Sequence, residues 1–437
     1  MDQTEIHLPW GKNRLHLNLP EGWKLQGVLE PSPKKGIADP AEECQRSLEN
    51  PIGLPRLSEL VKPSMRIVLV IDDLSRPTPI AQLLPPVLAE IERGGGRREN
   101  ITVVAALGVH RKMTFEEHAA RLGGEDRLAG LNIVDHDCDD PKKLVFLGMT
   151  SRGTPVYLNR TVAESDLIVS IGCIEPHVIA SFGGGYKNLL PGVAGRATIA
   201  HNHTLNCRPS TFNMVGQPIE NNPMRLDLEE ACKMLKQPVF LVNAVINSAL
   251  EVVKIVSGDP IEAHRAGVDV SQSIYGVRSS LADVVINASH PMDTDLRQGV
   301  KALSNTIRAV RKGGVMINLI RAEEGVGVFG LANRKLPLSK GMLRLLAPLL
   351  IPLVPKLKLK GMGEEDRFFL YFALQAMRHC TLLLYAPTIP EEIHERLPFV
   401  TFVSSPEEAI RLAQEKAPKK AKVLVFPHGG MTYPILG

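Results

Sequence analysis

The sequence predicts an α/β protein of two α/β domains, with mainly parallel sheets and an active-site cleft between the domains. First, 437 residues exceed the size at which a single core usually keeps growing. Second, short uninterrupted apolar runs alternate with helical segments, which is typical of parallel strands covered on both faces. Third, polar loops follow three of these runs, and open α/β sheets bind ligands at that carboxyl edge.

The first domain is expected to span residues 1–274 and to carry both cofactor binding and catalysis. A helix is expected at 81–93, because a run of three glycines then stops it. Thr114 and Glu117 have the spacing of a capping box, which predicts that another helix begins there. Buried strands are expected where apolar residues predominate, at 65–71, 101–107 and 167–171.

The second domain is expected to be Rossmann-like and to span residues 275–415. Its pattern is a strand at 282–287, a helix at 297–311 that Gly313 and Gly314 end, and a strand at 315–320. No G-x-G-x-x-G opens that helix, so a dinucleotide site loses its main support. Residues 416–437 hold a final strand, which either completes this domain or returns to the first.

Composition argues against several classes of protein. A net charge of +4 is small for this length and does not indicate nucleic-acid binding. The six scattered cysteines contain no C-x-x-C pair and indicate reduced thiols. The apolar stretch 345–354 is shorter than the roughly 20 residues that span a bilayer, so we expect it to be buried or partner-facing. We expect a cytoplasmic protein; a homo-oligomer is compatible with the sequence.

The densest chemical signal lies between residues 175 and 203. Gly183, Gly184 and Gly185 allow a ligand to approach the backbone closely, and Lys187 follows them as a phosphate partner or a covalent anchor. Imidazole is a suitable ligand for nickel, zinc or copper, and this segment holds His177, His201 and His203. Each residue alone is more often structural, but together, after a buried strand, they predict a site.

Two further strand-end loops carry polar side chains. Asp73 and Arg76 lie within one turn, and an arginine can bind the carboxylate of an organic acid through two hydrogen bonds. The alternative is an ion pair that fixes the turn. His110 follows a strand and Gly108, where an imidazole can serve as general base or make a structural hydrogen bond.

These residues, in order along the chain, resemble the motifs of the lactate racemase family. The resemblance covers about residues 65–320. It implies an isomerase that inverts C2 of a small 2-hydroxy acid and uses a nickel-pincer nucleotide, a pyridinium mononucleotide that holds nickel through two sulfurs and a ring carbon. The matching motifs are D-x-x-R-P at 73–77, G-x-H-R at 108–111, Pro-His with a lysine ten residues on at 176–187, Asn-His at 202–203, and P-x-D-x-x-x-x-Q-x-x-K at 291–301.

The resemblance also implies a role for each matching residue. Lys187 would carry the cofactor covalently, His203 would complete the nickel coordination, and the cofactor would lie against the three glycines. His110 and His177 would be the paired acid/base groups on opposite faces of the substrate. In such a mechanism a histidine takes the hydroxyl proton while hydride leaves C2 for the cofactor.

The remaining matches concern substrate binding and partners. Asp73 and Arg76 would orient the catalytic groups and hold the substrate carboxylate, and Gln298 and Lys301 of the second domain would close over the substrate. Proteins that build the cofactor are implied as partners. We expect a small-molecule substrate, no nucleic-acid partner and no membrane span.

The sequence also departs from the family pattern. The family loop reads A-G-aromatic-S-G-G-x-K, but here Ser181 stands in place of the first glycine and Gly183 in place of the serine. Arg297 replaces an aromatic residue that tends to precede the matching glutamine. We hypothesise that Arg297 meets a second anionic or polar group, which favours a substrate larger than lactate, such as a malate-like acid. The alternative is a solvated helix arginine.

Two other function classes stay open from sequence alone. One is a metal-dependent oxidoreductase or hydrolase that uses the same histidines. The other is a non-catalytic carrier of nucleotide or metal. The pair His110 and His177 favours an enzyme, because a carrier has no need of two acid/base groups.

Overall fold

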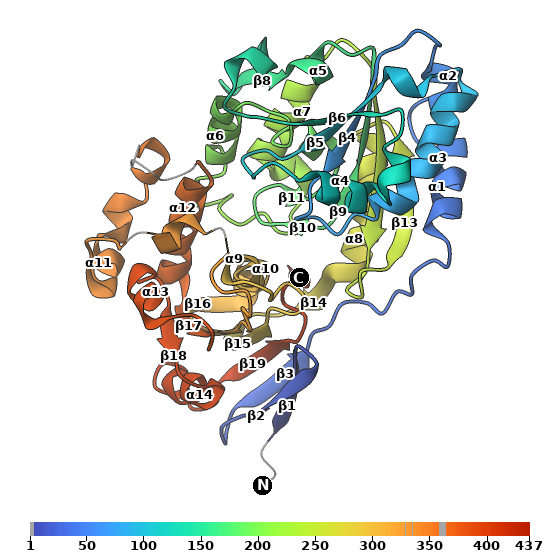
Figure 1. Ribbon diagram of the computed structural model, residues 1–437. Helices are drawn as coiled ribbons and strands as arrows, with labels where there is room; N and C mark the ends of the chain where they lie inside the picture. Colours follow the sequence, from blue (N-terminus) through green and yellow to red (C-terminus); the bar gives the residue numbers. More distant parts are fainter. Residues whose placement is uncertain (1–3, 328, 334, 358–363) are drawn as a thin grey trace.

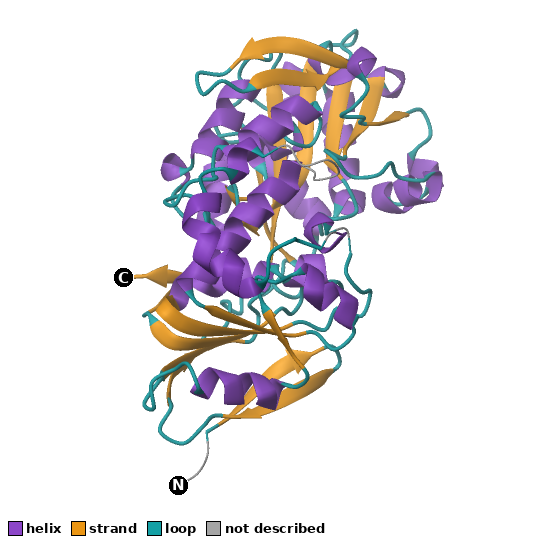
Figure 2. Ribbon diagram, turned by 90° about the vertical axis from the view of Figure 1, so that its left-hand side faces the viewer, coloured by secondary structure: helices purple, strands orange, loops and turns teal. Residues whose placement is uncertain are grey.

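Two six-stranded sheets, one above the other in Figure 1, form the framework of the protein. The structure is a computed structural model, and it describes residues 4–327, 329–333, 335–357 and 364–437. Figure 2 shows the sheets at opposite ends of the molecule, with helices between them. The α/β class with mainly parallel sheets, predicted from the sequence, is confirmed.

The first sheet has the strand order β13-β12-β9-β4-β5-β6, and only β13 runs antiparallel to its neighbour. Every residue of β4, β9 and β12 is buried, because helices cover both faces, and this explains why each strand is apolar except for one polar residue, Asp72, Ser170 and Asn243 respectively. The strands are β4 (Ile67–Asp72), β5 (Ile101–Ala106), β6 (Asn132–Asp135), β9 (Leu167–Ile174), β12 (Val239–Ile246) and β13 (Val252–Gly258).

The helices around the first sheet include the two that the sequence predicted. Helix α3 ends before Gly94, and α4 begins with a capping box between Thr114 and Glu117. The helices are α1 (Pro40–Glu49), α2 (Leu57–Leu60), α3 (Ile80–Arg93), α4 (Phe115–Leu122), α5 (Arg160–Ala163), α6 (Arg196–Thr204), α7 (Pro223–Cys232) and α8 (Glu262–Tyr275). Two antiparallel pairs accompany them, β7 (Leu144–Met149) with β8 (Pro155–Asn159) and β10 (Pro176–His177) with β11 (Ser181–Phe182).

The second sheet is parallel throughout and has the order β18-β17-β16-β15-β19-β3. Its strands are β3 (Lys24–Val28), β15 (Ala282–Ala288), β16 (Val310–Leu319), β17 (Thr381–Tyr385), β18 (Thr401–Val403) and β19 (Lys422–Phe426). The last strand, β20 (Tyr433–Leu436), pairs with β14 (Gly276–Ser279).

Both ends of the chain contribute to the second sheet. Strand β19, which is the strand that the sequence predicted within residues 416–437, hydrogen-bonds β15 on one side and β3 on the other and so lies in this sheet. The hairpin of β1 (Glu5–Trp10) and β2 (Asn13–Asn18) packs beneath it, against β15. Residues 5–28 were expected with the first domain, because nothing local in a short strand reveals that Lys24 pairs with Lys422. The domain limits themselves stay predictions.

The expected helix at 297–311 is wrong. It is divided into α9 (Leu296–Gly299) and α10 (Lys301–Thr306), and β16 already begins at Val310. Gly299 lies so close to Ile320 that a Cβ there would come within 2.2 Å of it. Gly313 and Gly314 lie within β16, where the pairing with β15 shifts register, so they form a strand bulge rather than a helix stop.

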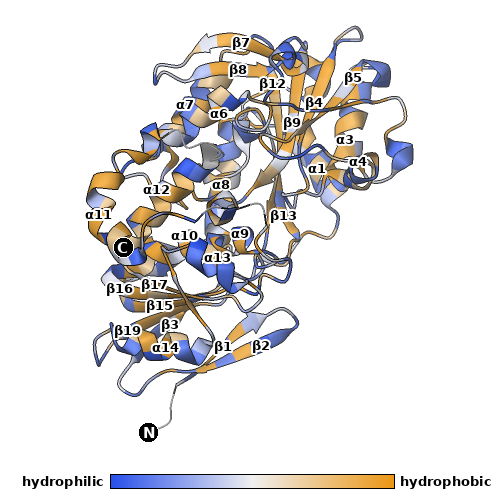
Figure 3. Ribbon diagram, turned by 60° about the vertical axis from the view of Figure 1, so that its left-hand side comes forward, coloured by the Kyte–Doolittle hydropathy of each residue, from blue (hydrophilic) through white to orange (hydrophobic). Residues whose placement is uncertain are grey.

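The apolar stretch 345–354 lies mostly in α11 (Lys340–Leu350), at the edge of the molecule in Figure 3. Ala347 and Ile351 are buried, whereas Leu345 and Leu349 are 78% and 70% exposed. In the described part of the chain, no helix has the length and apolar character needed to cross a membrane. The remaining helices are α12 (Glu364–His379), α13 (Glu391–Arg396) and α14 (Pro406–Gln414).

Candidate active site

The loops after β4, β5 and β9 converge at one edge of the first sheet, because these three strands are adjacent and parallel. Their polar side chains line a single cavity, together with residues of α9 and α10, which connect β15 and β16 of the second sheet. Eleven of the thirteen candidate residues from the sequence line it, whereas Gly185 and His201 do not. The eleven are Asp73, Arg76, His110, His177, Gly183, Gly184, Lys187, His203, Arg297, Gln298 and Lys301.

His110 is oriented by Asp73. Nδ1 of the imidazole lies 2.5 Å from Oδ2 of Asp73, while Oδ1 accepts from the backbone N–H (3.0 Å) and hydroxyl (2.5 Å) of Ser75. Burial alone would raise the pKa of Asp73, but these hydrogen bonds and the nearby charges hold it below its ordinary value. The carboxylate is therefore ionised, Nδ1 of His110 donates, and in the neutral ring the lone pair is on Nε2.

His177 has the opposite arrangement. Its Nδ1 accepts hydrogen bonds from the backbone N–H groups of Ile179 and Ala180, both at 3.2 Å. Burial and the positive charge of neighbours, Lys187 first among them, hold the pKa of His177 well below its ordinary value. The ring is neutral near pH 7, with its proton on Nε2. One histidine of the pair thus has an acceptor nitrogen at Nε2 and the other has a donor.

Arg76 forms an ion pair with Glu175, and both side chains border the cavity. Burial by itself would raise the pKa of Glu175, but Arg76 and Lys301 outweigh that effect, so its pKa lies below the ordinary value. Behind them, Arg121 holds Asp72 by an ion pair and donates to the carbonyl of Arg76 at 3.1 Å. The ion pair considered from the sequence joined Arg76 to Asp73, but in the structure Arg76 pairs with Glu175, and Asp73 contacts His110 and Ser75.

His203 and His201 lie on the same short helix, α6, but only His203 faces the cavity. Nδ1 of His203 donates to the carbonyl of Ile199 at 2.9 Å, which leaves the lone pair on Nε2, the form in which histidine binds a metal. His201 instead lies 2.8 Å from the hydroxyl of Thr154. Of the two, only His203 is suited to a ligand in the cavity.

The glycine loop is held against the first sheet by buried side chains. Arg225 is fully buried and donates to the carbonyls of Ala180, Phe182 and Gly184. Gly184 has φ +72°, and a Cβ there would come within 2.4 Å of the Asn243 amide, so no other residue fits.

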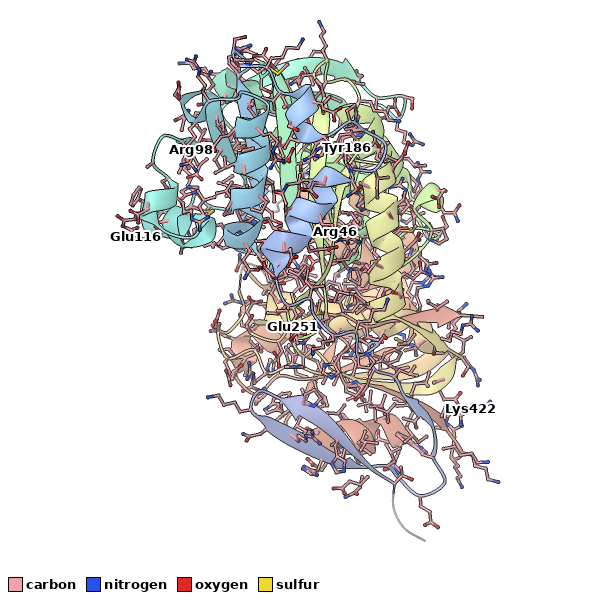
Figure 4. The ribbon with its side chains drawn as sticks, turned by 90° about the vertical axis from the view of Figure 1, so that its right-hand side faces the viewer. Arg46, Arg98, Glu116, Tyr186, Glu251 and Lys422 are labelled. Atoms are coloured by element: carbon pink, nitrogen blue, oxygen red, sulfur yellow. The ribbon has the colours of Figure 1, made fainter. Side chains whose placement is uncertain are left out.

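Lys187 follows this loop in a single turn of 3-10 helix that begins at Gly185. Its neighbour Tyr186 lies within the upper unit, among its strands and helices (Figure 4). Within this turn, Lys187 and Asn188 border the cavity.

The residues from α9 and α10 supply a second wall. Burial lowers the pKa of Lys301 to about 8, although the charge of Glu175 opposes this. Oε1 of Gln298 is buried and accepts no hydrogen bond in the structure. The guanidinium of Arg297 lies over the ring of Phe369, 4.1 Å from its centre.

Sequence reasoning did not select Glu175, Arg225 or His264 as site residues. Glu175 stood beside the recognised Pro-His motif and could have been suspected as a carboxylate in a basic loop. Arg225 lies on α7 and His264 on α8. Nε2 of His264 donates to the carbonyl of Gly183 at 2.8 Å and so helps to hold the glycine loop. No local pattern marked either residue.

Known proteins resemble this chain in sequence. Residues 10–213 match the family model described as the lactate racemase N-terminal domain. The lactate racemase of Thermoanaerobacterium thermosaccharolyticum is 33% identical over 328 residues, 74% of this chain and 76% of that protein. The lactate racemase of Lactiplantibacillus plantarum is 28% identical over 97% of this chain and 98% of its own.

Solved structures agree with this comparison. The apoprotein of the Thermoanaerobacterium thermosaccharolyticum lactate racemase superposes with a TM-score of 0.84 at 26% identity, covering 99% of this chain and all of that one. A protein from Thermotoga maritima has a TM-score of 0.65 at 17% identity, over 94% of this chain and all of its own, and shares the fold.

Proposed function

This chain belongs to the lactate racemase family of isomerases, and from that premise we propose that it inverts the C2 centre of a 2-hydroxy acid larger than lactate. The observation that carries the proposal is the pair His110 and His177 in one cavity, with opposite hydrogen-bonding roles at Nε2. In the proposed reaction the C2 hydroxyl loses its proton as the hydrogen leaves C2 and regains it after inversion. The acceptor nitrogen of His110 can take and return this proton, while the donor nitrogen of His177 hydrogen-bonds the oxygen.

His110 takes the proton of the C2 hydroxyl in this proposal. Its Nε2 holds the lone pair because Asp73 accepts the Nδ1 proton, and the ionised carboxylate stabilises the imidazolium that forms. His177 is the complementary group, whose Nε2–H hydrogen-bonds the substrate oxygen. After the hydrogen returns to the other face of C2, the proton held by His110 passes back to the oxygen, so the protonation state of both histidines is restored.

Arg76 and Lys301 are proposed to bind the substrate carboxylate. Both are cations at the cavity wall, and Glu175 lies between their charges. An incoming carboxylate would share these cations with Glu175, and a partly buried charge pair is stronger than one in water. Gln298, with its unpartnered Oε1, would accept a hydrogen bond from a ligand hydroxyl.

The cavity residues fit the nickel-pincer nucleotide that the family implies. We propose that Lys187 holds it covalently, that His203 ligates nickel through Nε2, and that Gly183 and Gly184 give it a wall without side chains. Gly185 supports this wall from behind. When bound, this group supplies an acceptor for the hydrogen that leaves C2 with its electron pair.

The donor set also argues against a metal held by protein alone. Among the described residues, the side chains that bring three metal-ligating atoms together are Glu5, His7 and His16, which are exposed on the β1–β2 hairpin. His110, His177 and His203 form no such group. A catalytic metal bound by the protein usually has three side-chain ligands. This favours the racemase over the metal-dependent oxidoreductase or hydrolase.

The proposal is tested by producing the chain together with cofactor-building proteins, which are its proposed partners. Single enantiomers of several 2-hydroxy acids would be incubated with the product and followed by chiral chromatography. We expect loss of optical purity, nickel in the protein, and added mass on Lys187 that is lost in Lys187→Ala. His110→Ala and His177→Ala should retain nickel and lose racemisation. Nickel and added mass without racemisation of any acid would refute the proposed function.

A malate-like substrate, with Arg297 as a substrate contact, stays an alternative prediction. The guanidinium of Arg297 borders the cavity and can meet a second polar or anionic group, as in malate. Comparing kcat/KM for malate and lactate tests this, because a clear preference for lactate would remove the idea.

A further inference from the structure

The cavity does not end at the catalytic residues. It continues into the part of the fold built on the second sheet, between α12 and the face of that sheet at β17. We call this part the apolar chamber, and Figure 1 shows α12 beside the strands concerned. Its principal lining residues are Phe369, Phe372, Ala373, Leu382, Leu384 and Phe399.

The local sequence explains why the chamber is apolar and open. On α12, positions 369, 372, 373 and 376 follow the i, i+3, i+4, i+7 spacing of one helix face. On β17, Leu382 and Leu384 alternate onto the face that looks toward this helix. Two of the four helix positions are alanines, Ala373 and Ala376, and their small side chains leave space between helix and sheet.

The chemistry of the chamber differs from that of the catalytic end. Its principal lining residues carry no charge, and the guanidinium of Arg297, which also borders the cavity, lies over the ring of Phe369, 4.1 Å from its centre. A carboxylate, phosphate or ribose inside would lose hydration without gaining partners. An alkyl chain or an aromatic ring would gain by leaving water.

We propose that the substrate is a 2-hydroxy acid whose C3 substituent is apolar, an alkyl chain of several carbons or a phenyl ring, and that this substituent occupies the apolar chamber. The inference rests on the proposed function, because the catalytic end fixes which end of the substrate enters first. With the carboxylate at Arg76 and Lys301, the substituent at C3 extends toward α12. The malate-like substrate is then the competing outcome.

Binding to the chain prepared without cofactor tests the chamber directly. Isothermal titration would compare lactate, 2-hydroxybutyrate, 2-hydroxyhexanoate, 3-phenyllactate and malate. Each buried methylene should raise affinity up to about fourfold, so 2-hydroxyhexanoate and 3-phenyllactate should bind at least tenfold more tightly than lactate. Malate should bind no more tightly than lactate. Equal affinities across the series, or tightest binding of malate, would overturn the proposal.

A variant that fills the chamber supplies the second arm. Ala373→Leu should weaken binding of 2-hydroxyhexanoate and 3-phenyllactate at least tenfold and leave lactate unchanged. Arg378→Leu adds the same side chain at an exposed position of α12 outside the cavity, and should leave the whole series unchanged. Thermal unfolding shows whether each variant is folded. If Ala373→Leu does not fold, the affinities of the unmodified chain for the five acids still test the proposal. If folded Ala373→Leu keeps the parent's ratio of 2-hydroxyhexanoate affinity to lactate affinity, the substituent does not occupy the apolar chamber.

Failure of the chamber and failure of the proposed function give different results. If the cofactor-loaded enzyme racemises no 2-hydroxy acid while the binding series holds, the proposed function fails and the chamber stands. If the loaded enzyme racemises lactate and 2-hydroxyhexanoate with equal kcat/KM and the binding series is flat, the function stands and the chamber fails.

Discussion

Replacing Asp73 by asparagine tests whether the carboxylate sets the tautomer of His110. The two side chains have the same shape, and the backbone N–H of Ser75 requires an acceptor at the Oδ1 position. The new amide would therefore place its carbonyl there and turn its NH2 group toward Nδ1 of His110. An NH2 group only donates, so Nδ1 would become the acceptor and the ring proton would move to Nε2. The acceptor nitrogen of the general base would be lost.

The expected loss is large in rate and small in stability. Where this substitution reverses the tautomer of a catalytic histidine, kcat falls by about 10⁴-fold, or about 5.4 kcal/mol of transition-state stabilisation. Folding loses only the difference between a charged and a neutral hydrogen bond, about 1 kcal/mol. The assay is racemisation of the preferred 2-hydroxy acid by loaded enzyme, followed by chiral chromatography, with nickel content and thermal unfolding measured on the same samples.

Ser75→Ala is the matched control. It removes the hydroxyl that contacts Asp73 but keeps both the carboxylate and the backbone N–H, so the tautomer of His110 is preserved. We expect a loss in kcat of tenfold at most. The reasoning is refuted if Asp73→Asn keeps nickel and stays within tenfold of the parent, because Asp73 would then only hold the loop.

Three further predictions concern other parts of the site. KM should rise as pH increases through about 8, because Lys301 then loses the proton that attracts the substrate carboxylate; Lys301→Arg should flatten this pH profile, since arginine stays charged. Arg225→Met should lower the free energy of unfolding by about 3–5 kcal/mol in urea, because three loop carbonyls lose their donor, and an effect below 1 kcal/mol would contradict this. Ser181 has φ +63°, so the free energy of unfolding in urea should be about 1 kcal/mol higher for Ser181→Gly than for Ser181→Ala. Both variants lose the hydrogen bond from Asn222, and only alanine keeps the strained backbone.

The sequence was most informative where the physics is local. Strands β4, β5 and β9 were predictable because burial on both faces favours a strand made almost entirely of apolar residues. Parallel neighbours end at one edge, so the loops with Asp73, His110 and His177 could be expected together. The structure does bring them to one cavity.

The parts that sequence missed depend on distant contacts. Gly313 and Gly314 have the composition of a helix stop, and only pairing with β15 identifies them as a bulge. Strand β3 carries no sign that its partner is β19. Arg225 is an ordinary helix arginine in sequence, yet in the fold it donates to three carbonyls of the glycine loop.

The central claim is that His110 and His177 act on the C2 hydroxyl and that the C2 hydrogen leaves with its electron pair. Racemisation of one enantiomer in D2O tests this most directly, with the C2 position read by NMR. A proton removed from carbon by a histidine would exchange with solvent, whereas a hydrogen that leaves and returns with its electrons would not. We predict that the inverted product keeps protium at C2. Deuterium at C2 of the inverted product would contradict the account.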